Sequence, residues 1–391
     1  MNATPHNSNR RRASQARQRR GALTLAMLIL LVIFVLLAAW LLDWVYLVLV
    51  QRNMHQRTDL VALAATPALL DEDLLRDAGG APQADQEDDL DDALALGHRY
   101  RRLNNRAGSQ LLALESGDIR LVPGFVADPT RPATARFGLL VGEQQFNGLK
   151  VLGQRTASSA NPVARMIDGF WQAGPANVES TSVAALDNLV VGFRPTRSLP
   201  APLAPLAISA AAWRNERATD SNSNGINELE VRLASQKPSA LPANGALVGL
   251  NGTFNLACLG EQIIGGVTPS DLGPNGTFAP ATPSQPLVAP GTQKTTAARA
   301  AELVLQFEFV AASVMPLRAW PIYDNFDGSA EQATLVGFVA GRVLGAEVVD
   351  DRLTVTIEPA FLIHASVLTA RPDDPSNPQR NLYVHRLTLV R

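Results

Sequence analysis

Hydrophobic and polar positions divide the chain into an apolar N-terminal segment, an acidic stretch and a long region of short apolar runs. The segment from Ala22 to Leu42 holds 21 uncharged, almost wholly apolar residues. At about 1.5 Å per residue, a helix of this length spans ~31 Å, which matches a hydrocarbon core of ~30 Å. Trp40, Trp44 and Tyr46 lie at its end, where aromatic side chains suit a membrane–water interface. The pattern predicts a transmembrane helix.

The helical pattern continues beyond the apolar run. Leu47, Val50, Met54 and Ala65 follow roughly a three-to-four spacing, and the first residue that breaks a helix is Pro67. We therefore expect one helix over 21–66, with a transmembrane half and an amphipathic half. Its apolar stripe needs a cover, either from the chain's own domain or from another protein.

Asp43 directly follows the apolar run, at the expected outer interface. A carboxylate there is either hydrated at the interface or pairs with a neighbouring helix. We predict that the partner-binding residues are Asp43, Leu47, Val50 and Met54, and that their partners are other membrane subunits. Packing of the same stripe on the chain's own domain is the alternative.

The charge of the N-terminal tail predicts the topology. Residues 1–20 carry six arginines and no acidic residue. Such a tail stays in the cytoplasm, so the remaining chain lies outside it. The apolar run is also longer than the core of a secretory signal, about 7–15 residues, which favours a retained anchor. We expect a single-pass protein of the cytoplasmic (inner) membrane, with its C-terminal domains in the periplasm or outside.

Composition shifts divide the rest of the chain. Residues 67–92 are rich in acidic side chains and predict a solvated linker. Short apolar runs bounded by Gly, Pro and Asn then predict a first β-rich domain over 93–199. The proline-rich stretch "SLPAPLAPL" indicates a stiff connector, and a second β-rich domain is expected over 206–391. The predicted fold class is α+β.

Three segments predict particular elements. "VESTSVAALDNLVVGF" is typical of a hairpin that turns at Asp187 and Asn188, and "LVGFVAGRVLGAEVVDDRLTVTIEP" of one that turns at Val349–Asp351. "AARAAELVLQFEFV" is ambiguous between a helix and a helix that passes into a strand. "NLYVHRLTLVR" predicts a further strand.

A possible calcium loop lies in "DSNSNGINE". Asp220, Asn222 and Asn224 place oxygen ligands at positions one, three and five of a loop, and Gly225 supplies the turn. Val231 occupies position twelve, where an EF-hand has glutamate, so Glu228 is the nearby substitute. These four ligand candidates indicate either a calcium site or an Asn/Gly turn that opens the following strand.

Charge and motifs exclude several functions. Because the first 42 residues hold six of the chain's 34 basic residues and none of its 36 acidic ones, the exported part is acidic. This argues against a nucleic-acid partner, whose phosphates need clustered Lys and Arg. Cys258 is the single cysteine, which leaves no internal disulfide. Because the sequence lacks hydrolase, zinc-protease and phosphate-loop motifs, we expect no enzyme activity, no small-molecule substrate and no cofactor other than the possible calcium.

The N-terminal segment resembles that of the TadE/TadG-like proteins of tight-adherence (Flp-type) pilus assembly. The shared pattern is an Arg-Arg-Gly entry, an apolar helix, an Asp near its end, a polar stretch, and Asp-x-x-Ala-Leu-Ala-Ala. The matching positions are Arg19, Arg20, Gly21, Asp43, Gln56, Asp59, Ala62, Leu63, Ala64 and Ala65. The resemblance covers about 50 residues at the N-terminal end of the chain.

Two departures from the family pattern refine this resemblance. Pseudopilin members carry a glutamate five residues after the cleaved glycine, where this chain has Ala26, so an unprocessed, TadG-like protein is expected. The Asp-x-Ser-x-Ser metal loop of some relatives is also missing from the sequence. The resemblance implies a membrane-anchored, non-enzymatic pilus-assembly scaffold whose partners are the membrane and other assembly subunits. An anchored extracytoplasmic hydrolase and a calcium-dependent adhesive module are the alternatives.

Overall fold

A computed structural model describes most of the chain. The described residues are 8–70, 72–76, 86–107, 118–129, 137–138, 146–165, 174–234, 241–250, 258–272, 275–279, 296–327, 332–371 and 380–390. The chain divides into two compact units. Unit 1 comprises 1–58, 103–120 and 152–181, and unit 2 comprises 59–102, 121–151 and 182–391.

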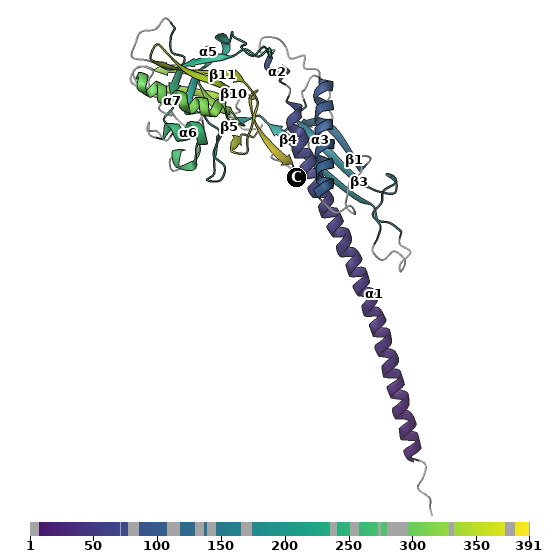
Figure 1. Cartoon of the computed structure of the whole chain (residues 1–391). Helices are drawn as coiled ribbons and strands as arrows, with labels where there is room; N and C mark the ends of the chain where they lie inside the picture. Colours follow the sequence, from purple (N-terminus) through teal and green to yellow (C-terminus); the bar gives the residue numbers. More distant parts are fainter. Residues whose placement is uncertain are drawn as a thin grey trace, which may run out of the picture. The chain divides into compact units, whose positions relative to one another are not determined.

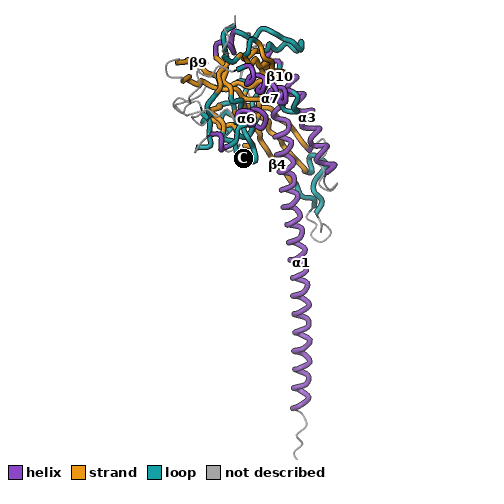
Figure 2. Tube along the Cα trace, turned by 60° about the vertical axis from the view of Figure 1, so that its left-hand side comes forward, coloured by secondary structure: helices purple, strands orange, loops and turns teal. Residues whose placement is uncertain are grey.

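The N-terminal helix is a single uninterrupted element. Helix α1 spans Ser8–Ala65, and Figures 1 and 2 both draw it without a break. It ends directly before a 3-10 turn, Thr66–Leu69, which contains Pro67 near its start. The expected end at Pro67 is thus confirmed, because proline has no N–H for a further helical hydrogen bond. The helix begins earlier than expected, within the arginine-rich tail.

The acidic stretch after α1 is partly helical. Helix α2 spans Asp73–Arg76, and helix α3 spans Gln86–Ala107. The five acidic residues between 86 and 92 therefore belong to the start of α3 rather than to a linker. Acidic side chains stabilise the first turns of a helix through its dipole, which explains the difference. Residues 77–85 of the expected linker lie outside the described residues.

One six-stranded sheet has the order β12-β14-β4-β3-β1-β2. Its strands are β1 (Ile119–Val126), β2 (Phe137–Gly138), β3 (Gly148–Arg155), β4 (Val178–Asp187), β12 (Leu362–Ile363) and β14 (Val384–Val390). The expected C-terminal strand is confirmed as β14. It pairs antiparallel with β4, with Leu387 opposite Leu186. The boundary expected between 199 and 206 therefore does not separate two sheets.

A second six-stranded sheet has the order β7-β11-β10-β9-β6-β8. Its strands are β6 (Leu206–Ser209), β7 (Leu229–Arg232), β8 (Gly245–Leu247), β9 (Leu317–Asp327), β10 (Gln332–Val349) and β11 (Arg352–Pro359). The hairpin of β10 and β11 is confirmed. Asp350 and Asp351 make its turn with φ of 53° and 62°, a left-handed conformation that aspartate tolerates.

Helices cover this second sheet. Helix α7, Ala297–Ala311, packs on β10 and β11, as Figure 1 shows. Buried Leu303, Phe307 and Val310 line the inner face of α7, and Phe307 stacks on Trp320 of β9. The ambiguous segment is thus entirely helical. Short helices α5 (Ala210–Asn215) and α6 (Leu259–Gly265) complete the described elements of this part.

The hairpin expected at Asp187 is wrong. Strand β5, Val190–Phe193, leaves β4 and pairs with β13, Val367–Thr369, in a separate two-stranded sheet. Asp187 is buried, and its carboxylate accepts a hydrogen bond from the Leu189 N–H. This bond turns the chain out of the first sheet, so the Asp-Asn pair redirects the strand instead of reversing it. The overall α+β class, with an N-terminal apolar helix and a sheet-rich body, is confirmed.

Candidate functional site

Helix α1 can cross a membrane by length and composition. Its apolar segment begins at Leu23, and the most hydrophobic window has a mean hydropathy of 3.2 with none of its residues buried by the chain. Large apolar side chains such as Met27, Leu30 and Phe34 are about two-thirds exposed. An apolar helix surface that the chain does not cover itself is typical of a lipid-facing segment.

Asp43 is buried by the chain itself. It is 4% exposed, and its Oδ2 lies 3.4 Å from Nη1 of Arg165 in unit 1. The Arg165 side chain is 30% exposed, so the pair has one buried and one accessible member. The buried carboxylate thus has an oppositely charged side chain as a neighbour, as buried charges require. Arg165 was not identified from the sequence.

The amphipathic half of α1 also packs on the chain's own strands. Val50 and Met54 are 1% and 2% exposed, whereas Leu47 is half-buried. A Cβ on Gly153 of β3 would lie 2.8 Å from Thr58 Cγ2 and 3.4 Å from Met54 Cε. Glycine at this position therefore lets the β3 backbone approach the helix closely.

Hydrogen bonds reinforce this packing within unit 1. Thr58 Oγ1 and Ser180 Oγ, on β4, lie 2.7 Å apart, and Ser180 Oγ also lies 3.1 Å from His55 Nδ1. Thr58 is fully buried, so its hydroxyl needs such a partner. Helix and strand are thus joined by polar contacts as well as by apolar ones.

Unit 2 has comparable contacts near the end of α1. Ser182 Oγ donates to Asp59 Oδ1 at 2.6 Å. A Cβ on Gly97 of α3 would lie 3.4 Å from Ala65 Cβ and 3.5 Å from Val61 Cγ1. Glycine at position 97 and alanine at position 65 therefore allow α3 to pack closely against α1. Asp59 and Ala65, matched above through the family resemblance, thus act here in packing within the chain.

The four expected partner-binding residues are thus mostly covered internally. Asp43, Val50 and Met54 are buried within the protein, which corresponds to the alternative of internal packing. The surface of α1 beyond the membrane that another protein could reach is formed by exposed Gln51, Arg52 and Gln56. We call these three residues the outer face of α1.

The expected calcium loop is a turn held by its own hydrogen bonds. The two carboxylate oxygens of Asp220 accept from the N–H groups of Asn224 and Gly225, at 3.1 and 2.9 Å. Ser223 and Gly225 have positive φ angles of 61° and 84°, as expected for a tight turn. The Asn224 side-chain oxygen accepts from the Ile226 N–H at 2.8 Å. Each of these three oxygen atoms accepts one hydrogen bond and keeps a second lone pair, so the calcium site stays a prediction.

A buried glutamate fastens this turn to the second sheet. Glu358 of β11 is 1% exposed, and its Oε2 accepts from the side-chain amides of Asn222 at 2.6 Å and Asn224 at 2.8 Å. The other oxygen, Oε1, lies 3.1 Å from Arg342 Nη1. Within the described residues, no cluster of three or more His, Cys, Asp or Glu residues is arranged to hold a metal ion.

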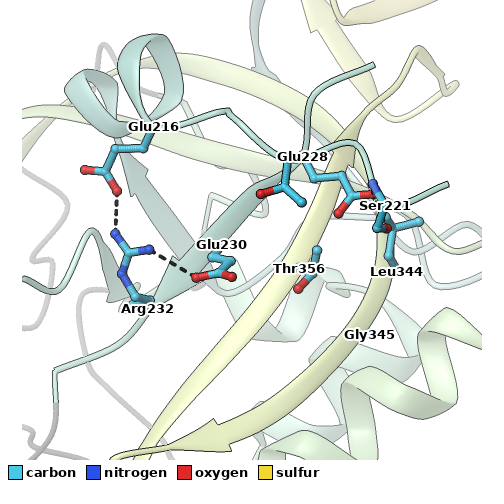
Figure 3. A pocket seen from close by; sticks show the side chains of 9 residues that line it. Glu216, Ser221, Glu228, Glu230, Arg232, Leu344, Gly345 and Thr356 are labelled. Carbon is cyan, nitrogen blue, oxygen red and sulfur yellow. Dashed lines mark hydrogen bonds and ion pairs between the residues drawn. The ribbon is translucent and has the colours of Figure 1, made fainter. Parts of the chain in front are cut away.

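A polar pocket of about 470 Å³ lies beside this turn. Figure 3 shows Glu216 and Glu230 on either side of Arg232, which pairs with both carboxylates, while Glu228 Oε1 accepts from the Ser221 backbone and hydroxyl. The remaining lining residues are Thr219, Leu344, Gly345 and Thr356. Because Arg232 is shared by two glutamates, its charge is compensated. The pocket is suited to a small polar solute, and the expected ligand Glu228 lies on its wall.

Comparisons of the chain with protein-family models, curated proteins and solved structures found no match. The function is therefore inferred from the residues and their geometry.

Sequence reasoning missed the residues that secure α1. Arg165, Gly153, Ser180 and Ser182 lie on segments whose pairing with α1 depends on tertiary structure. A signal was available for one of them. Ser180 and Ser182 lie two positions apart in "VESTSVAALD", which places both hydroxyls on one face of the strand, together with Val178.

Proposed function

We propose that the protein is a membrane-anchored, non-enzymatic scaffold subunit of a surface-appendage assembly system of the tight-adherence type. The observation that carries this proposal is the direct attachment of β3 and β4 to α1. Met54, Thr58 and Ser180 join strands and helix by close packing and hydrogen bonds. A passive anchor needs only a flexible tether, whereas a scaffold must hold its exported part in place beside its neighbours.

The resemblance of the N-terminal segment supports the choice of system. Arg19, Arg20, Gly21 and Asp43 follow the TadE/TadG-like pattern in order. The proposed location is the cytoplasmic membrane, with the N-terminus in the cytoplasm and the sheets outside. The proposed partners are the other membrane subunits of the assembly system, which contact the outer face of α1.

Site-specific cross-linking tests the proposal. A photo-reactive amino acid at Gln56, on the outer face of α1, is expected to capture other membrane subunits in native membranes. Glu347, which is exposed on β10, is the matched control position for the sheet-rich body. After mild detergent extraction, captured proteins are identified by mass spectrometry.

Deletion of the gene supplies the functional readout. Loss of surface appendages, restored by the full-length chain, supports the proposal. Retention of normal appendages in the deletion strain, together with the absence of appendage subunits among the cross-linked proteins, contradicts it. Cross-links from Glu347 alone move the proposed contact from α1 to the body.

A further inference from the structure

We infer that the lipid-facing surface of α1 extends past Asp43 to Leu49, so that the Asp43–Arg165 ion pair lies within the membrane, below the outer edge of the headgroup region. The pattern of exposure along α1 carries this inference. It rests on membrane anchoring by α1 and is independent of the system in which the protein works.

The side chains that follow Asp43 are apolar and uncovered. Trp44 and Leu49 are 56% and 57% exposed, and Val45 and Val48 are 39% and 43% exposed. The next two residues, Gln51 and Arg52, are polar and exposed. The apolar surface that begins at Leu23 therefore continues to Leu49 and is replaced by polar residues only beyond Val50.

Asp43 does not interrupt this apolar surface. Its carboxylate points inward and is 4% exposed, so neighbouring lipid would contact Trp44, Val48 and Leu49 instead. An unpaired carboxylate at membrane depth is costly, and intramembrane acids are expected to face the protein and to pair. The contact with Arg165 at 3.4 Å meets both conditions. A carboxylate placed in water above the bilayer would need neither burial nor a partner.

The length of the apolar surface fits a whole bilayer. Leu23 to Leu49 is a run of 27 residues. As a helix it measures ~40 Å, comparable to the ~40–45 Å of a bilayer with its headgroup regions. Asp43 lies six residues before the end, which corresponds to a depth of ~9 Å. Lipid is therefore the occupant that this surface fits, because it continues the transmembrane surface without a break.

Arg165 is the second member of the ion pair. Its side chain is 30% exposed, so part of the arginine is accessible while its Nη1 lies 3.4 Å from Asp43. Arginine at headgroup depth binds phosphate oxygens through its planar guanidinium. We assign Arg165 a double contact, with Asp43 on one side and a lipid phosphate on the other. The segment that carries it is thus a membrane-contacting part of the exported chain.

Depth measurements with spin labels test the inference. The full-length chain, with Cys258→Ser, is reconstituted in vesicles of phosphatidylcholine and phosphatidylglycerol. Nitroxides are attached to single cysteines at Val45, Val48 and Leu49, with Ile33 as the deep control and Gln56 as the aqueous control. Collisions with oxygen report lipid exposure, and collisions with a water-soluble nickel chelate report water.

The expected result is that positions 45, 48 and 49 lie between the two controls, with more oxygen collisions and fewer nickel collisions than Gln56, and that nickel collisions increase from Val45 to Leu49. Nickel accessibility at Val48 equal to that at Gln56 would place the bilayer edge at Asp43 and overturn the inference. Low accessibility to both reagents would also overturn it, because protein and not lipid would then cover this face.

A variant isolates the ion pair. Arg165→Ala removes the positive charge beside Asp43 at membrane depth, so the helix is expected to shift outward and nickel collisions at Val48 to rise severalfold. Arg165→Lys retains the charge and is expected to preserve the depth. Arg155→Ala is the matched control, because Arg155 pairs with Asn161 in the same unit. Unchanged depth in Arg165→Ala would show that the pair lies in water, and the scan of the unmodified helix decides the question if this variant folds poorly.

Discussion

Asp43 and Arg165 form an ion pair across 122 positions of the sequence. The pair joins the helix that enters the membrane to a segment that follows β3. A carboxylate that follows an apolar run is thus paired with an arginine of the sheet-bearing part of the chain. Folding of that part and placement of the helix are coupled through this contact.

Replacement of Arg165 by alanine should destabilise the fold. Arg165→Ala leaves the buried Asp43 carboxylate without its charged partner, which is expected to cost about 1–3 kcal/mol of unfolding free energy. Arg165→Lys should recover part of this loss. Thermal melts in detergent micelles measure the change. The double variant Asp43→Asn/Arg165→Ala should lose less unfolding free energy than the sum of the losses in the two single variants. Equal melting temperatures for all variants would contradict a stabilising pair.

A charge placed in the contact between α1 and β3 should lower the unfolding free energy more than the loss of Arg165 does. Met54→Glu places a carboxylate at a site that is 2% exposed, next to Gly153 and Thr58. We expect a loss of about 3 kcal/mol or more, since a buried unpaired charge is strongly unfavourable. Gln56→Glu, on the outer face of α1, is the matched control and should leave stability nearly unchanged. An unaltered melting temperature in Met54→Glu would return Met54 to the candidate partner surface.

Calcium should not stabilise the protein. The Asp220 and Asn224 oxygens already accept backbone hydrogen bonds, and the Asn222 amide is held by Glu358. Calcium would have to share these oxygens with their present donors, and Glu358 already holds the side chains of Asn222 and Asn224 in place. We expect equal melting temperatures in millimolar calcium and in chelator. Should calcium raise the melting temperature, Asp220→Ala and Glu228→Gln would identify the ligands, because a true site loses the effect in both variants.

Acidic pH should weaken the fold through His385. Burial lowers the pKa of this histidine to about 4, and its Nδ1 has no partner among the described residues that could receive an added proton. The unfolded chain, with a histidine pKa of about 6.5, then binds the proton first as the pH falls. Stability is therefore full above pH ~6.5 and decreases down to pH ~4, by about 3 kcal/mol in total.

Replacement of the histidine tests this slope. His385→Gln can retain a donor to the Leu382 carbonyl, which His385 Nε2 contacts at 2.8 Å. Urea unfolding of this variant should show a much smaller fall between pH 6.5 and pH 4. Burial also lowers the pKa of His364, so addition of His364→Gln should remove a further part of the slope. A variant that keeps the full slope would assign it to other groups.

Local patterns in the sequence were sufficient to predict several elements. The apolar run and Pro67 predicted the end of α1, and the β10–β11 hairpin followed from two apolar strands around Val349–Asp351. Both features depend on residues that are close in sequence, so residue spacing and turn chemistry determine the local structure. The same holds for the turn at Asp220. Its hydrogen bonds join residues close in sequence, except those that the Asn222 and Asn224 amides donate to Glu358.

Pairing between distant segments could not be predicted. The strand β5 leaves β4 because β14 occupies the adjacent place in the sheet, and β14 lies about 200 residues later. The cover of α1 likewise depends on Gly153 and Ser180, which no periodicity connects to Met54 or Thr58. Amphipathic spacing predicts that the apolar face of a helix is covered, but it does not specify which residues cover it.

The pairing of β14 with β4 also has a kinetic consequence. During synthesis, Val183–Asp187 emerges about 200 residues before the partner strand, Arg386–Val390, exists. At ~5–20 residues per second, this delay amounts to ~10–40 s. Throughout this interval one edge of β4 has unpaired N–H and C=O groups, which can form hydrogen bonds with strands of other chains. A chaperone that occupies this edge, or synthesis slow enough to keep nascent chains apart, would therefore determine the yield of folded protein more than its equilibrium stability does.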